Sequence, residues 1–85
     1  MYKLHNILRG HEFWVTSVAF SPEGNFLATS SMDNTIKIWR LPEATLADEL
    51  VGHSDIVTRV VFSPDGNILS SSSNDNTIRL WINER

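Results

Sequence analysis

The 85-residue sequence lacks several features that would place it in a familiar class of protein. It contains no cysteine, so a disulfide framework and a thiolate metal site are both excluded. No apolar run approaches the roughly 20 residues that a membrane-spanning helix needs. The first residues also lack the charged and apolar regions of a signal peptide. We therefore expect a soluble, cytoplasmic protein that makes no contact with a membrane.

Positive charge is scarce as well. Seven Lys and Arg residues stand against ten Asp and Glu, and the basic residues are scattered singly along the chain. Nucleic-acid-binding domains need a basic stripe or patch, so we expect no nucleic acid partner. Small chains often need a disulfide, a metal or oligomerisation for stability, and here oligomerisation remains.

The dominant positive feature is an internal repeat. Residues 10–39 recur as residues 52–81, each residue meeting its counterpart 42 positions later, and eighteen of the thirty pairs are identical. Further pairs are chemically similar, among them Glu23/Asp65, Lys37/Arg79 and Ile38/Leu80. A fixed period of this length is the signature of a repeat architecture.

Segments rich in β-branched and aromatic residues alternate with turn signals such as Ser-Pro-Glu-Gly-Asn at 21–25. We expect strands at 2–8, 15–20, 26–31, 35–39, 46–51, 57–62, 68–72 and 77–82. No helix of ten residues fits between the turns. The sequence therefore predicts an all-β protein of four-stranded antiparallel units.

Both faces of these sheets carry apolar residues. Ser-Val-Ala-Phe at 17–20 and Arg-Val-Val-Phe at 59–62 place apolar side chains at successive positions, and hence on opposite sides of a strand. A sheet with two apolar faces must be sandwiched. Two units stacked on each other would still leave two outer faces bare.

Three motifs in each copy are similar to those of the WD40 repeat family. They are Gly10-His11, Ser21-Pro22-Glu23-Gly24-Asn25 and Asp33-Asn34-Thr35-Ile36-Lys37-Ile38-Trp39, with their counterparts 42 residues later. The resemblance covers nearly the whole chain, at a period within the family range of about 40–45 residues. Two departures are the closing dipeptides Trp39-Arg40 and Trp81-Ile82 in place of Trp-Asp, and Ser30 and Ser72 where many repeats have glycine.

This resemblance implies a β-propeller, in which four-stranded blades surround a central channel. A repeat in this family supplies the outermost strand of one blade and the three inner strands of the next. We accordingly assign residues 1–8 to an outer strand donated to a neighbouring subunit, 9–51 to the first blade and 52–85 to a second blade lacking its own outer strand. Head-to-tail assembly would pair residues 2–8 with residues 77–83 of the neighbour.

Ring size follows from the repeat count. Whole chains contribute two blades each, so the total is even. Eight blades need about 45° per blade and six need about 60°, against about 51° for seven. Because eight lies nearer to seven, we favour a homotetramer of eight blades, with a homotrimer of six as the next choice.

The resemblance also assigns two structural hydrogen-bond tetrads. Their members are His11, Thr29, Asp33 and Trp39, and then His53, Ser71, Asp75 and Trp81. A buried Trp N–H needs an acceptor, and a hydroxyl and a His can relay the hydrogen bonds to a carboxylate. The alternative is an acyl-transfer triad. Two equivalent copies without a nucleophile elbow or an oxyanion-hole signature favour the structural role, so we predict no enzyme and no cofactor.

We expect no metal site. The three histidines His5, His11 and His53 fall in separate parts of the repeat pattern, and the Asp-Asn turns are too short to supply the six to eight oxygens that calcium requires.

The loop after Gly-His is the better candidate for recognition. Its candidate partner-binding residues are Glu12, Phe13, Trp14, Ser54, Asp55 and Ile56. Exposed aromatics make good anchors for a protein or peptide partner. The alternative is that Trp14 and Ile56 cap the edge of the core.

Two functions remain open. The first is a non-enzymatic protein–protein interaction scaffold, a self-assembling propeller that binds a protein or peptide on its top face. The alternative is a purely structural module without a ligand, either a piece of a longer propeller or an engineered building block.

Overall fold

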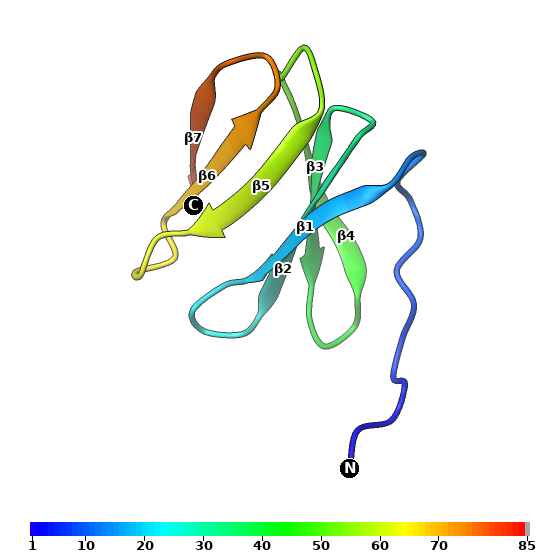
Figure 1. Cartoon of the computed structure of the whole chain (residues 1–85). Coiled ribbons are helices and arrows are strands. Elements are labelled where there is room, and N and C mark those ends of the chain that lie inside the picture. Colours follow the sequence, from blue (N-terminus) through cyan, green and yellow to red (C-terminus); the bar gives the residue numbers. More distant parts are fainter. Residues whose placement is uncertain (85) are drawn as a thin grey trace.

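The computed structural model describes residues 1–84, which form seven strands in two antiparallel sheets (Figure 1). The strands are β1 (Val15–Phe20), β2 (Phe26–Ser31), β3 (Thr35–Arg40), β4 (Thr45–Val51), β5 (Val57–Phe62), β6 (Ile68–Ser73) and β7 (Ile78–Ile82). The first sheet has the order β1-β2-β3-β4 and the second the order β5-β6-β7. The all-β prediction is confirmed. None of the described residues forms a helix that could cross a bilayer.

The turns explain why both sheets fold at the same points of the repeat. Gly24 and Gly66 have φ values of 81° and 77°, and Asn34 and Asn76 have values of 74° and 71°. These values lie in the left-handed region, which glycine enters freely and asparagine tolerates better than most residues. The β1–β2, β2–β3, β5–β6 and β6–β7 connections therefore turn where the sequence carries Gly or Asn, whereas the β3–β4 turn has Ala44 at a φ of 62°.

The register is the same in the two sheets. Leu27 lies opposite Trp39 in the first sheet, and Leu69 lies opposite Trp81 in the second. The first strand of each sheet also contains an irregularity after its opening valine, between Val15 and Ser17 and again after Val57. The sequence repeat is thus a structural repeat down to the pairing of individual residues.

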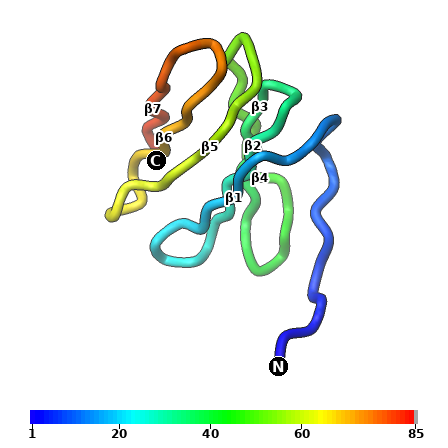
Figure 2. The backbone as a smooth tube through the Cα atoms, in the orientation of Figure 1, coloured from blue at the N-terminus to red at the C-terminus, as the bar shows by residue number. Residues whose placement is uncertain are grey.

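The core lies between the two sheets, where β1 and β2 pack against β5 (Figure 2). Ala28 and Ile36 contribute from the first sheet, and Val57, Val60 and Leu69 contribute from the second. These apolar contacts supply most of the attraction between the sheets. A hydrogen bond of 2.6 Å from the Thr16 hydroxyl to the Val57 carbonyl also crosses the interface. The two sheets are therefore stacked face to face.

The N-terminal segment contacts neither sheet as a strand. Residues 1–9 form no strand and run away from the sheets, as Figures 1 and 2 show. Leu4 is almost fully exposed and Leu8 is half-buried. The strand expected at 2–8 is therefore absent from the single chain. Its pairing with residues 77–83 of a neighbour stays a prediction.

Candidate functional site

The first tetrad is a continuous chain of hydrogen bonds across the first sheet. Trp39 on β3 donates its indole N–H to the Thr29 hydroxyl on β2 over 2.9 Å. Thr29 Oγ1 lies 2.7 Å from His11 Nε2, and His11 Nδ1 lies 3.1 Å from Asp33 Oδ2. The network is complete when the hydroxyl donates to Nε2 and the Nδ1–H donates to the carboxylate.

The second tetrad repeats this arrangement. Trp81 Nε1 donates to Ser71 Oγ over 2.9 Å, Ser71 Oγ lies 2.7 Å from His53 Nε2, and His53 Nδ1 lies 2.9 Å from Asp75 Oδ2. Ser71 and His53 are buried. No buried side-chain nitrogen or oxygen in residues 1–84 lacks a partner. The structure thus brings together all eight side chains of the two tetrads.

The hydroxyl, imidazole and carboxylate of each tetrad have the connectivity of a hydrolytic triad, but their setting is unsuited to catalysis. Ser71 is only 2 % exposed, and its hydroxyl already accepts the indole N–H of Trp81. An attacking nucleophile must be reachable by a substrate and lie beside donors for the developing oxyanion. The geometry therefore supports a structural network.

Each tetrad carboxylate binds more than its histidine. Burial raises the pKa of Asp33, but hydrogen bonds from the Thr35 hydroxyl, the Glu12 amide, His11 and the Thr35 amide outweigh it and lower that pKa to about 2. For Asp75, the hydrogen bond from the Thr77 hydroxyl is the largest cause of a pKa well below its usual range. Both groups are carboxylates at neutral pH, as acceptors of several hydrogen bonds should be.

These carboxylates also position the loops predicted to bind a partner. Asp33 Oδ2 accepts the Glu12 amide over 3.1 Å, and Asp75 Oδ2 accepts the Ser54 amide over 3.1 Å. The backbone carbonyl of Trp14 accepts the Met32 amide over 2.9 Å. The loop backbones are therefore held by fixed hydrogen bonds to the turns beside them.

The side chains on these loops point outward, with one exception. Phe13 is 66 % exposed and Trp14 is 79 % exposed. Glu12, Ser54 and Asp55 are also exposed, whereas Ile56 is half-buried. In the single chain, Trp14 does not cap the core. A rigid backbone that presents exposed aromatics is well suited to anchoring a partner.

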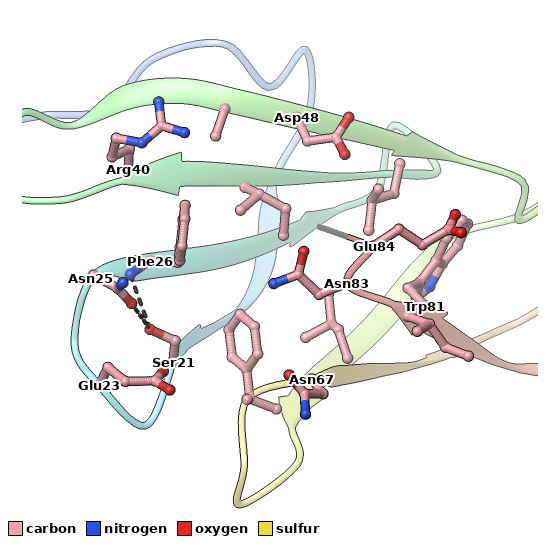
Figure 3. A pocket seen from close by; sticks show the side chains of 17 residues that line it. Ser21, Glu23, Asn25, Phe26, Arg40, Asp48, Asn67, Trp81, Asn83 and Glu84 are labelled. Carbon is pink, nitrogen blue, oxygen red and sulfur yellow. Dashed lines mark hydrogen bonds between the residues drawn. The ribbon is translucent and has the colours of Figure 1, made fainter.

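A groove between the sheets was not foreseen from the sequence. It has a volume of about 500 Å³ and is bordered by Asp48 of β4 on one side and by Trp81 and Asn83 on the other (Figure 3). The Arg40 guanidinium lies 5.7 Å from the centre of the Phe26 ring at one end. The groove lies where the second sheet, within residues 1–84, has no counterpart of β4, which is a tertiary feature without a local motif.

The sequence profile of the WD domain, G-beta repeat family matches residues 2–40 and 44–81. The chain belongs to the WD40 repeat family. The two matched units place residues 2–9 and 44–51 at equivalent positions of the repeat, and they include both tetrads.

Individual related proteins each match about half of the chain. A histone transcription regulator, slm9 of Schizosaccharomyces pombe, is 45% identical over 40 residues, which cover 47% of this chain and 5% of the relative. The pre-mRNA-splicing factor PRP46 of Yarrowia lipolytica is 42% identical over 45 residues, covering 53% and 10%. The probable cytosolic iron-sulfur protein assembly protein 1 of Malassezia globosa is 51% identical over 41 residues, covering 47% and 12%. The matched segments thus span a small part of each relative's length.

Proposed function

We propose that this WD40 chain is a non-enzymatic interaction scaffold that binds a protein or peptide through the loops after Gly10-His11 and Gly52-His53. The observation that carries the proposal is the contrast between the tetrad side chains and the loops beside them. The imidazole, hydroxyl and carboxylate of the first tetrad are hydrogen-bonded to one another, and the loop whose backbone Asp33 holds carries the exposed side chains of Phe13 and Trp14. The relatives bear the names of a transcription regulator, a splicing factor and an assembly protein, which supports a binding role. A cytoplasmic location stays a prediction.

Peptide selection on the purified protein tests this binding surface. Peptides selected from a displayed library would be measured against the wild type and against Trp14→Ala. A buried aromatic anchor contributes at least about 2 kcal/mol to binding, so we expect a loss of more than tenfold. Leu46→Ala, which shortens a partly exposed apolar side chain on β4 outside the loops, is the control and should bind as the wild type does.

The same variant separates the two interpretations of Trp14. If Trp14 is a ligand-binding residue, Trp14→Ala keeps the molar mass and thermal stability of the wild type and loses only the peptide. If Trp14→Ala instead loses assembly or stability, it serves as a packing residue, and the binding face must lie elsewhere. Selected peptides that bind Trp14→Ala undiminished would also contradict the proposal.

We further propose that copies of the chain associate head to tail, with the outer face of the first sheet against the outer face of the second sheet of the next copy and residues 2–8 paired with residues 77–83 of the neighbour. Four copies are favoured over three. The outer face of the first sheet carries Val18 and Phe20, the repeat counterparts of Val60 and Phe62, which pack against the first sheet. On the outer face of the second sheet, the exposed Ile78 is the counterpart of the buried Ile36. Each bare face therefore resembles one half of the interface already formed within the chain. If the chain is instead a purely structural module, it would associate through these faces and bind no ligand of its own.

A further inference from the structure

The two copies of the repeat differ in their loops at one end of the sheets and agree at the other end. Residues 12–14 read Glu-Phe-Trp, whereas their counterparts 54–56 read Ser-Asp-Ile. The turns at the opposite end, residues 21–25 and 63–67, differ only in Glu against Asp. The two loops nevertheless make the same backbone hydrogen bonds to the turns beside them. The fold therefore does not dictate which side chains these loops carry.

The two loops lie next to each other in space. The hydrogen bond from the Thr16 hydroxyl to the Val57 carbonyl joins the start of β1 to the start of β5. Trp14 stands two residues before Thr16, and Ile56 stands one residue before Val57. Both loops open at the same end of the two sheets, together with the β2–β3 and β6–β7 turns (Figure 1). We call this end the loop face, made of residues 12–14, 32–34, 54–56 and 74–76.

The loop face combines exposed aromatic rings with carboxylates. Phe13 and Trp14 supply the rings. The four segments contain four acidic residues and neither Lys nor Arg; the acidic residues are Glu12, Asp33, Asp55 and Asp75. Glu12 and Asp55 are exposed, and neither forms an ion pair with another described residue. Two free carboxylates thus flank the rings.

Basic side chains beside the loop face do not cancel this charge. Lys37 lies against Gly10 but is paired with Glu49. Arg79 lies over Gly52, and Arg9 is exposed just before Gly10. With histidine neutral, the four carboxylates of the loop face stand against these two guanidinium groups. The excess charge is therefore negative.

A basic side chain satisfies both properties of this surface. Its cationic head is attracted to the face of an indole ring as well as to a carboxylate. Its aliphatic stem can pack on an aromatic ring while the charged head stays in water. A neutral side chain would gain only the apolar contact, and an acidic one would be repelled.

We propose that the loop face selects a cationic segment of a partner protein, with a Lys or Arg side chain against Trp14 and within the field of Glu12 and Asp55. This inference rests on the proposed function and adds the chemistry of the partner. Complementary charge at the rim of an interface contributes to the choice of partner and to the rate of association.

The peptides selected from the displayed library supply the first measurement. Among peptides that need Trp14, we expect Lys and Arg to be enriched over the unselected library and Asp and Glu to be depleted. One such peptide is then compared with a form in which a basic residue is replaced by glutamine. An exposed ion pair changes affinity about threefold, so we expect each replacement to weaken binding by about that factor.

Charge variants of the protein locate the effect. In the double variant Glu12→Gln, Asp55→Asn, the difference between the basic peptide and its glutamine form should disappear. The double variant Glu43→Gln, Asp48→Asn has the same net charge, changes exposed residues outside the loop face and should preserve the difference. Asp55 and Asp48 each accept the backbone amide of the next residue, and asparagine keeps an acceptor at both positions.

Two results would overturn the inference and leave the proposed function standing. In the first, the peptides that need Trp14 are neutral or acidic. In the second, the two double variants discriminate equally between the basic peptide and its glutamine form, so that the charge of the loop face has no local role. If no selected peptide needs Trp14, the proposed function fails, and this inference fails with it.

Discussion

The hydroxyls of Thr29 and Ser71 each serve two partners, a tryptophan and a histidine. A hydroxyl can donate and accept at once, which neither a methyl nor a carboxylate can do. Thr in one copy and Ser in the other share the hydroxyl and differ only in the methyl group, so both can make the same two contacts. Of the two tetrad tryptophans, Trp39 is more deeply buried than Trp81. Water can therefore replace a lost hydrogen-bond partner of the Trp39 N–H less easily.

Thr29→Val should therefore destabilise the protein. It leaves the Trp39 N–H and His11 Nε2 without their shared partner, and an unsatisfied buried polar group costs roughly 1–3 kcal/mol. We expect a loss of about 2 kcal/mol in the free energy of unfolding, measured by urea denaturation at one fixed protein concentration. Thr29→Ser keeps the hydroxyl and should lose less. Equal stability of Thr29→Val and the wild type would contradict the network.

Because the pKa values of the tetrad carboxylates are lowered in the folded protein, we expect its stability to depend on pH. The pKa of Asp33 is about 2 in the folded protein and that of Asp75 is also lowered, whereas an unfolded Asp has a pKa of about 3.9. Between these values the unfolded chain binds more protons, so the stabilisation is present above about pH 4 and is lost as the pH falls toward 2. Melting temperatures measured from pH 7 down to pH 2 should begin to drop near pH 4 and continue to fall toward pH 2. Asp33→Asn should reduce that slope, and a flat wild-type profile would refute the mechanism.

At the scale of the elements, seven of the eight expected strands are present, because local signals specify them. Turn residues such as Gly24 and Asn34 adopt backbone angles that other residues resist, and the runs between them are rich in β-branched and aromatic side chains. The tetrad residues could be named from the family motifs. The eighth strand, expected at 2–8, pairs with no segment among residues 1–84, and a strand without a partner has no ladder to stabilise it.

The groove and the edge of β7 could not be predicted in this way. Lys37 and Arg79 are similar residues at equivalent positions, and nothing in their local sequence separates a buried lysine paired with Glu49 from an exposed guanidinium. The difference depends on whether a fourth strand lies alongside, which is a matter of long-range pairing. A local pattern carries no information about such a neighbour.

On the scale of the whole molecule, the outer faces predict association. Light scattering at several concentrations should show a mass rising toward about 38 kDa for four copies of the 9.6 kDa chain, or toward about 29 kDa for three. Val18→Asp places a charge on the outer face of the first sheet and should keep the protein at the monomer mass, because a buried unpaired charge is strongly unfavourable. Thr45→Asp, at an exposed position of β4, is the control. A wild type that stays folded and monomeric would refute association.

The sequence by itself determined the repeat and most of the strand and turn positions, because these depend on local patterns or on equivalence between the copies, and its resemblance to the WD40 family assigned the residues of the two tetrads. Only the tertiary structure decided which apolar faces are buried. Val18 is 59 % exposed and its counterpart Val60 is 2 % exposed, while Ile36 is fully buried and Ile78 is 74 % exposed. Identical residues on equivalent strands differ in this way because burial is a property of what packs against a face, and the strand's own sequence does not contain its neighbour.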